Sequence, residues 1–285
     1  MRRTNTLASC VVASALGAAL IAAGCTIYGY GSTADTADGG VDATASDALS
    51  DAPSSDALPD GGDAGADATP CAPDMIATSA GCIDAFEVTV DDYLAFVTKK
   101  GGNMSGQPPE CAWNATYAPQ DGGAVVPGNA PVGNVDWCDA FAYCAFRGKH
   151  LCGKIGGGTN PIGADNDAQQ DEWFAACSHA DDGQHLYPYG SAFDASTCNV
   201  SGGGRAPVGS FPDCIGGYPG LFDMSGNSAE WTNSCFHDAA ADAATDFCRL
   251  RGGSYQASVS SSCNRDGGEM RSAAVEKFGF RCCAN

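Results

Sequence analysis

Three segments of the chain carry apolar residues three or four positions apart, the spacing of an amphipathic helix. Thr89 is a suitable N-cap for the first, whose apolar side holds Tyr93, Leu94, Phe96 and Val97. Asp136 can cap the second, and Gly148 is a natural stop. The apolar side of this second segment holds Trp137, Phe141 and Cys144. The third runs from about 167 to 178 and carries Trp173, Phe174 and Cys177. The pattern therefore predicts three helices.

Long regular elements are not expected after residue 178. The pieces YPYG, APVGSF, RLRGGSY and FGFRCC are short, have extended character and are separated by turns. We find no second hydrophobic cluster and no repeat of 20–50 residues in the sequence. The pattern predicts one domain over residues 71–285, composed mostly of irregular loops with short strands.

The N-terminal residues have the pattern of an export signal. Two arginines precede an apolar run from Val11 to Ala23, which is too short to span a membrane. The run ends in AAGC, which looks like a bacterial lipobox, so we expect a signal peptide over residues 1–24 and lipid on Cys25. An ordinary secretory signal, with Cys25 free or paired, is the alternative. Thr26 favours an anchor in the outer membrane of a Gram-negative cell envelope.

Residues 25–70 are almost wholly Ala, Asp, Ser, Thr, Gly and Pro. Such a segment cannot bury enough apolar surface to offset the entropy lost on ordering, so it predicts a disordered acidic tether. The chain has a net charge of −20, and removing two signal-peptide arginines and nine tether aspartates leaves about −13 on residues 71–285. This charge disfavours nucleic acid and anionic membrane surfaces as partners.

Cysteine usage indicates an oxidising compartment. Of 16 cysteines, Cys10 leaves with the signal and Cys25 is the expected anchor, so an even number, 14, remains from Cys71 to Cys283. In an exported chain this number predicts disulfides. The sequence has no C-x-x-C and its four histidines are scattered, which disfavours zinc and thioredoxin-like sites.

The stretch GLFDMSGNSAEW, from Gly220 to Trp231, crowds oxygen-bearing side chains between aromatic residues. These side chains belong to Asp223, Ser225, Asn227, Ser228 and Glu230. The residues alone leave two interpretations open. One is a calcium loop, because Ca²⁺ prefers hard oxygen ligands. The other is a turn whose side chains satisfy its own backbone groups.

Eight short motifs, in this order, resemble the formylglycine-generating enzyme family, also called the sulfatase-modifying-factor family. They are IDAFEVTVDDYLAFV, PVGNVDWCDAFAYCAFRGKHL, DEWFAAC, YPYG, APVGSF, GLFDMSGNSAEWT, RLRGGSY and GFRC, and they span Ile83 to Cys282. The resemblance implies an α+β, C-type-lectin-related fold, mostly irregular, with few helices and short strands. The cysteine count adds the expectation that this fold is rich in disulfides.

The resemblance also implies a calcium site. Family members bind calcium through the segment that matches Asp223, Gly226, Ser228 and Glu230, where two of the ligands are backbone carbonyls. We therefore expect Ca²⁺ to be bound by the side chains of Asp223 and Glu230 and by the other two carbonyls. Two carboxylates brought together in one loop would repel each other without a cation.

In the sulfatase-activating enzymes of the family, two cysteines after a Gly-Gly-Ser motif bind copper(I), which suits soft thiolates. Aligned from the Gly-Gly-Ser motif of this chain, the two positions are Ala257 and Ser262. Aligned from Arg271, Cys263 matches the second catalytic cysteine and Ser258 the first. At least one copper thiolate is missing in either alignment. Cys263 is thus a candidate catalytic residue only in the second alignment, and a disulfide is the favoured interpretation.

Family members carry a disulfide from the segment that matches DEWFAAC to the region around Cys263, but the usual partner position is Gly268 here. Cys177 would be left alone unless Cys263 takes that place, so we expect Cys177 to pair with Cys263. Cys144 with Cys282 resembles the other disulfide of the family. Spacing suggests three short-range pairs, Cys71 with Cys82, Cys198 with Cys214 and Cys235 with Cys248. The sequence does not pair the other four cysteines, which are Cys111, Cys138, Cys152 and Cys283.

Two functions of different classes fit these observations. The first is a non-catalytic binding or structural module at the cell envelope, stabilised by calcium and disulfides, with a protein or a glycan as its ligand. The second is an oxidase that converts a substrate cysteine to formylglycine with copper and oxygen. The missing copper thiolate favours the first, and the scattered histidines disfavour an iron oxygenase.

Overall fold

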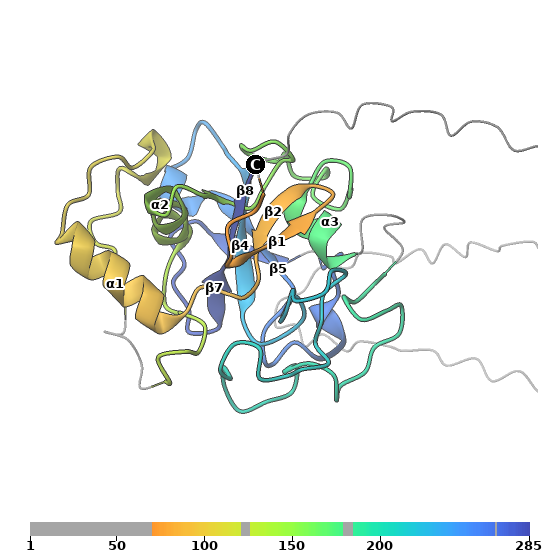
Figure 1. Ribbon diagram of the computed structural model, residues 1–285. Helices are drawn as coiled ribbons and strands as arrows, with labels where there is room; N and C mark the ends of the chain where they lie inside the picture. The colour runs from red at the N-terminus through yellow and green to blue at the C-terminus, as the bar shows by residue number, and fades with distance from the viewer. Residues whose placement is uncertain (1–69, 121–125, 179–184, 266) are drawn as a thin grey trace, which may run out of the picture. The chain divides into compact units, whose positions relative to one another are not determined.

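The computed structural model describes residues 70–120, 126–178, 185–265 and 267–285. The expected signal peptide, Cys25 and the expected tether up to residue 69 lie outside the described residues. In the described ranges the chain forms two four-stranded sheets and three α-helices, joined by long loops (Figure 1). This confirms the predicted α+β fold class with few helices and short strands. No helix in these ranges is long and apolar enough to cross a membrane.

The first sheet joins the two ends of the described domain. Its strand order is β1-β2-β8-β3, with β1 at Met75–Thr78, β2 at Gly81–Asp84, β8 at Cys282–Ala284 and β3 at His150–Leu151. All three pairings are antiparallel, and Cys283 lies opposite both Ile83 and His150. The C-terminal strand is therefore inserted between an N-terminal hairpin and the middle of the chain.

The second sheet carries the residues of most interest for function. Its order is β6-β5-β4-β7, with β6 at Gly267–Met270, β5 at Phe247–Arg251, β4 at Ala229–Phe236 and β7 at Phe278–Phe280. The β4–β7 pair is parallel, and the other two are antiparallel. The register of β4 against β5 shifts between Trp231 and Cys235, so the far end of β4 is displaced relative to its start.

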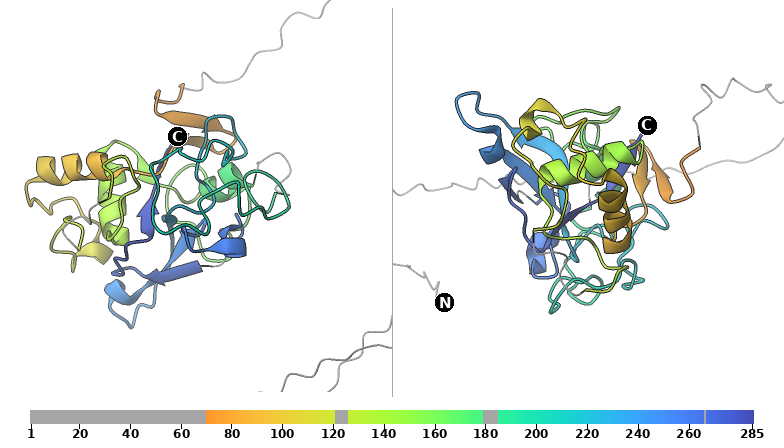
Figure 2. Two further views of the ribbon diagram at one scale, coloured as in Figure 1. Left: turned by 90° about the horizontal axis from the view of Figure 1, so that it is seen from below. Right: turned by 90° about the vertical axis from the view of Figure 1, so that its left-hand side faces the viewer.

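The first two helices begin where their capping residues predict. Helix α1 spans Val90–Lys100, and the Thr89 side chain accepts a hydrogen bond from the Asp92 N–H. Helix α2 spans Trp137–Phe146 and begins with a reciprocal capping box between Asp136 and Asp139. The two helices lie side by side, and α2 lies against β3 of the first sheet and β4 of the second (Figures 1 and 2). One detail differs from expectation, because Leu94 is 40% exposed while Tyr93 and Phe96 are buried.

The third helix is shorter than predicted. Helix α3 spans Glu172–Cys177, and Asp171 is its N-cap, bound to the Phe174 N–H at 2.6 Å. The preceding residues form a turn instead of a first helical turn, because the Asp167 carboxylate accepts hydrogen bonds from the Gln169 N–H and from the Gln170 side chain. Local side-chain bonds of this kind compete with a helix.

Two aromatic-rich clusters form the core of the domain. The larger lies between α1, α2 and the second sheet and includes Tyr93, Trp137, Trp231 and Phe280. The smaller surrounds Trp173 of α3. Their largest side chains are at most 1% exposed, so both clusters are closed to solvent and fix the helices against the strands.

Seven disulfides cross-link the domain and use every cysteine in the described ranges. The five pairs expected from sequence are present: Cys71–Cys82, Cys144–Cys282, Cys177–Cys263, Cys198–Cys214 and Cys235–Cys248. The four cysteines that sequence left unassigned form Cys111–Cys138 and Cys152–Cys283. The disulfide-rich character of the fold is thus confirmed.

Candidate functional site

The sulfur of Cys263 lies in the protein core and is bonded to Cys177 of α3. Cys263 is 0% exposed, and its N–H donates to the Leu186 carbonyl at 2.7 Å. The short 3₁₀ helix η3, at Ser258–Ser261, precedes it and turns the chain inward. Cys263 is therefore not present as a thiolate, which is the form that a catalytic or copper-binding cysteine needs.

The other positions that match the copper ligands of the family carry no sulfur. They are Ala257 and Ser258, with Ser262 directly before Cys263. A methyl group and hydroxyls are poor ligands for copper(I), which prefers soft thiolates. The residues present do not fit copper. A cleft of about 350 Å³ lies nearby, and its lining includes polar side chains of Ser254, Glu269 and Lys277.

The predicted calcium loop has a strained, tightly bonded backbone. Asp223, Gly226 and Asn227 have positive φ angles of 58°, 80° and 56°. The Asn227 N–H donates to the Asn199 carbonyl at 2.7 Å, and the Asn199 Nδ2 donates to the Asn227 Oδ1 at 3.0 Å. The polar groups of the loop are therefore satisfied by a distant segment of the chain, not by the loop's own side chains as the second sequence interpretation has it.

Glu230, the expected calcium ligand at the start of β4, is bound by a cation of the protein itself. Arg281 Nη2 lies 2.7 Å from Oε1, and Arg281 Nε lies 2.8 Å from Oε2. The indole Nε1 of Trp173 donates to Oε2 at 2.7 Å. Both carboxylate oxygens are occupied and both charged residues are at most 1% exposed. In this arrangement the Glu230 carboxylate does not fit the role of a calcium ligand.

Only one of the two carboxylate oxygens of Asp223 has a hydrogen-bond partner. Its Oδ2 accepts a hydrogen bond from the Gly209 N–H at 2.6 Å, whereas Oδ1 is buried and has no hydrogen-bond partner. Burial raises the pKa of Asp223 to about 6. In the described part of the chain, no group of three or more His, Cys, Asp or Glu side chains is arranged to hold a metal ion. Calcium binding stays a prediction, with Asp223 Oδ1 as the open oxygen.

Sequence analysis missed Glu87, a third carboxylate in this region. It is 2% exposed, its Oε1 accepts from the Ser228 N–H at 3.1 Å, and its Oε2 accepts from the Asn227 side chain at 3.0 Å. Burial, together with the nearby carboxylates of Asp223 and Glu230, raises its pKa well above the ordinary value. Its neighbours in sequence give no signal of this role, because its partners lie about 140 residues away.

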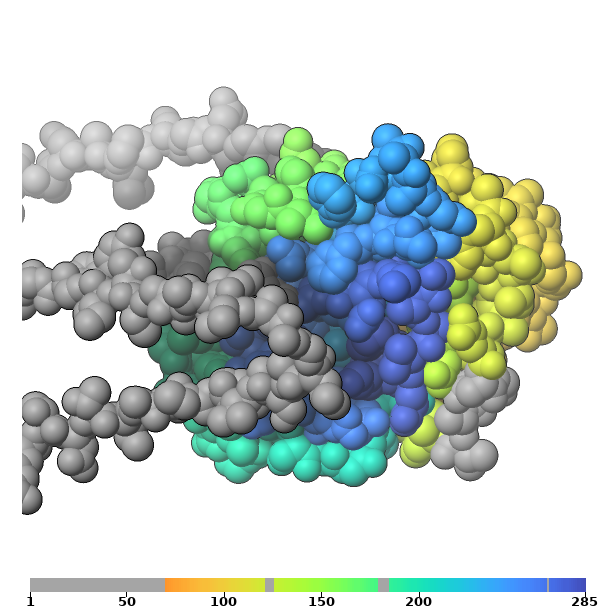
Figure 3. Space-filling model, turned by 180° about the vertical axis from the view of Figure 1, so that it is seen from behind, coloured from red at the N-terminus to blue at the C-terminus, as the bar shows by residue number. Residues whose placement is uncertain are grey.

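A further cleft lies elsewhere, beyond the displaced end of β4. It has a volume of about 470 Å³ and is lined by Pro109, Glu110, Trp137, Thr159, Asn233, Cys235, His237, Ala243 and Arg271. Figure 3 shows this face, where the segment after β4, in light blue, lies between the segments around residues 110 and 160. A volume of this size is in the range of small-molecule sites, ~300–1,000 Å³.

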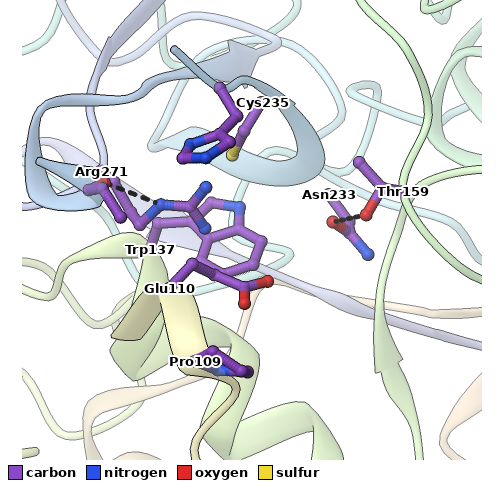
Figure 4. Close-up of a pocket in the computed structure, with 9 residues that line it drawn as sticks. Pro109, Glu110, Trp137, Thr159, Asn233, Cys235 and Arg271 are labelled. Carbon is purple, nitrogen blue, oxygen red and sulfur yellow. Dashed lines mark hydrogen bonds between the residues drawn. The ribbon is translucent and has the colours of Figure 1, made fainter. Parts of the chain in front are cut away.

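A stacked arginine forms one wall of the cleft. The guanidinium of Arg271 lies 4.4 Å from the centre of the Trp137 ring (Figure 4). Arg271 Nη2 binds Asp246 Oδ2 at 2.8 Å, and its Nε donates to the Ala243 carbonyl at 3.1 Å. Asp246 also accepts from His237 Nδ1, at 2.9 Å. Asp246 thus holds two basic side chains in place at the cleft, and sequence analysis had singled out none of these three residues as functional.

Comparison with known proteins shows the family of the chain. Residues 58–285, most of the chain, match the family described as the sulfatase-modifying factor enzyme 1-like domain. The chain therefore belongs to the sulfatase-modifying factor family, which includes formylglycine-generating enzymes.

The relatives include one protein named as an inactive enzyme and one named as an oxygenase. The chain is 30% identical over 174 residues to the inactive C-alpha-formylglycine-generating enzyme 2 of Mus musculus, which covers 54% of this chain and 49% of the relative. It is 32% identical over 114 residues to a hercynine oxygenase of Mycolicibacterium smegmatis, covering 38% of this chain and 23% of the relative. The solved structure of PvdO from Pseudomonas aeruginosa is similar with a TM-score of 0.48 and 19% identity, over 70% of this chain and 78% of that one. The chain spans about half the length of the two inactive formylglycine-generating enzymes that it matches, those of Mus musculus and Bos taurus.

Proposed function

We propose that this protein is a non-catalytic binding or structural module of the sulfatase-modifying factor family. The Cys177–Cys263 disulfide carries the proposal, because Cys263 is the one cysteine that either alignment places on a copper-binding position of the catalytic members, and its sulfur is used in this bond. The similarity to an inactive formylglycine-generating enzyme supports the same conclusion. Without a thiolate pair, the domain lacks the soft ligands that copper(I) chemistry needs.

An activity assay tests this proposal directly. The purified protein is incubated with copper, oxygen and a cysteine-containing sulfatase peptide, and mass spectrometry follows conversion of the thiol to an aldehyde. We expect no conversion above a copper-only control. A formylglycine product that depends on the protein and disappears in Cys263→Ser would overturn the proposal and establish the oxidase alternative.

The cleft around Arg271 is the proposed ligand site of the module. Its size and its mixture of an arginine, a carboxylate and an amide support this role, since such sites combine a few fixed polar groups with apolar walls. A protein or a glycan is the proposed partner. Arg271→Met, which keeps the packing on Trp137, should abolish binding of a partner captured by the wild type, with Arg265→Met as the matched surface control. Equal binding by the two variants would place the ligand elsewhere.

The proposed location is the outer membrane of a Gram-negative cell envelope, with lipid on Cys25. The apolar run that ends in AAGC supports it, and the disulfides support an oxidising compartment. Mass spectrometry of the mature N-terminus tests the anchor. A chain that begins at an acylated Cys25 is expected, and an unmodified Cys25 would exclude lipidation.

A further inference from the structure

One disulfide lies in the wall of the cleft around Arg271. Cys235 and Cys248 face each other on the antiparallel strands β4 and β5 and are bonded. Cys248 is 0% exposed, whereas Cys235 is partly exposed and lines the cleft. Figure 4 shows Cys235 on the side of the cleft opposite Glu110. A molecule in the cleft therefore contacts Cys235, whereas Cys248 is buried and does not line the cleft.

Exposure alone does not distinguish this disulfide. Among the cysteines in the described ranges, Cys71 is also only partly buried, and its partner Cys82 is 7% exposed. Cys71 and Cys82, however, do not line this cleft. The Cys71–Cys82 bond therefore serves as an internal reference with similar exposure and a different environment.

A histidine and an arginine give the Cys235–Cys248 bond its particular environment. His237 lies two residues after Cys235, lines the same cleft and has a side chain that is 57% exposed. Its Nδ1 donates to the Asp246 carboxylate, which leaves Nε2 as the proton-accepting nitrogen of the neutral ring. Arg271 is held on the same carboxylate. A fixed cation such as this guanidinium stabilises thiolates in its neighbourhood.

We propose that Cys235–Cys248 is a thiol-exchange site for small thiols that enter the cleft. The incoming thiol gives its proton to His237 Nε2, and the resulting thiolate attacks Cys235 Sγ. A bond forms between the two sulfurs while the Cys235–Cys248 bond breaks, and its electron pair passes to Cys248, which takes the proton back. The product is a mixed disulfide on Cys235 and a free thiol on Cys248.

A second equivalent of thiol completes the reaction. It attacks the mixed disulfide, releases Cys235 as a thiol and leaves as part of the small-molecule disulfide. The two small thiols are oxidised and the protein disulfide is reduced, so the reaction balances without a further reagent. This inference does not rest on the proposed binding function, because it concerns a different group of the cleft.

The probe is reduced glutathione, added to the purified full-length protein at concentrations that leave its near-ultraviolet circular dichroism unchanged. Differential alkylation and peptide mass spectrometry follow the reaction at each cysteine over time. We expect glutathione on Cys235 and a free Cys248 at least about tenfold faster than any adduct on Cys71 or Cys82. Opening of Cys71–Cys82 at the same rate or faster, or an adduct mainly on Cys248, would overturn the proposal.

A pair of variants tests the part played by the histidine. His237→Gln should slow the reaction at Cys235 about tenfold and leave the rate at Cys71 unchanged. His150→Gln is the matched control, since His150 also lies on a carboxylate, that of Glu172, but outside the cleft. A wild-type rate in His237→Gln would contradict the assigned base. If His237→Gln does not fold, the selectivity of the wild-type reaction decides the proposal alone.

Discussion

Arg281 binds both carboxylate oxygens of Glu230 in the interior of the domain, 51 residues apart in the chain. The guanidinium also donates to the carbonyls of Asp84 and Phe222, at 3.1 and 2.9 Å. It therefore joins the start of β4 to the segment between β7 and β8 and to the loop before β4. The carboxylate that the family resemblance assigned to calcium here has a structural partner within the protein.

Replacing Glu230 tests the importance of this ion pair. Glu230→Gln leaves the Arg281 guanidinium buried without its main counter-charge, so the free energy of unfolding should fall by about 3 kcal/mol. Denaturant unfolding with the disulfides intact measures this loss. Glu276→Gln is the control, because Glu276 is half-exposed and lies 4.0 Å from Arg205. The Glu276→Gln substitution should lower the free energy of unfolding by less than about 1 kcal/mol. If both variants lose the same free energy of unfolding, the buried ion pair stabilises the fold no more than the exposed one does.

The pKa of Asp223 predicts how stability varies with pH. Because burial raises this pKa from 3.8 to about 6, the folded protein holds the proton more tightly than the unfolded chain does. The carboxyl group therefore costs stability as the pH rises from about 4 to about 6, and the cost persists above that range. Asp223→Asn removes the buried charge, and asparagine tolerates the φ angle of 58°. In the presence of a chelator at about pH 8, the free energy of unfolding of the variant should exceed that of the wild type by about 3 kcal/mol.

Below about pH 4 the wild type and Asp223→Asn should have similar stability, since Asp223 is then protonated in both folded and unfolded states. Asp136 and Asp171 also have pKa values raised to about 6. Their titration changes the stability of the wild type and of the variant equally, so it does not affect the comparison. A variant that is less stable than the wild type at about pH 8 in a chelator would contradict this account.

The same two proteins test calcium. If Ca²⁺ binds Asp223 in the folded state, added calcium should raise the melting temperature of the wild type, and Asp223→Asn should lose that increase. If the melting temperature of the wild type is the same in calcium and in a chelator, and the purified protein holds no calcium, the calcium prediction is wrong.

The loop before β4 should tolerate no side chain at Gly226. Its φ angle is 80°, and a Cβ atom there would collide with the Asn199 carbonyl oxygen and lie 2.8 Å from Val200 Cγ1. Gly226→Ala should lower the free energy of unfolding by about 3 kcal/mol. Gly203→Ala, where a Cβ meets nothing within 4 Å, should change it by less than about 0.5 kcal/mol. Similar values for the two variants would show that the loop adapts.

Local signals in the sequence were sufficient to predict where α1 and α2 begin. Thr89 and Asp136 cap α1 and α2 because each cap and its partner are only three residues apart. The start of α3 was placed too early because the turn at Asp167 competes with the helix over the same few residues. Apolar spacing does not report such local side-chain hydrogen bonds.

The candidate sites are formed by residues that are far apart in the sequence. The sequence therefore predicted these sites only in part. The loop around Asp223 was found from its crowded oxygens, but the partnership of Glu230 with Arg281 was not. The cleft was missed altogether, because α2, the loop before β5 and the segment after β6 come together only in the folded domain. Pairing of Cys111 with Cys138 likewise followed from no local pattern.

The state of Cys263 tests the central claim most directly. The full-length protein is alkylated without reduction, digested, and its peptides are mapped by mass spectrometry. The account predicts that Cys263 occurs only in a peptide cross-linked to the Cys177 peptide, and that the purified protein contains no stoichiometric copper. An alkylated, free Cys263 together with about one copper ion per chain would contradict it and assign the protein to the oxidases of its family.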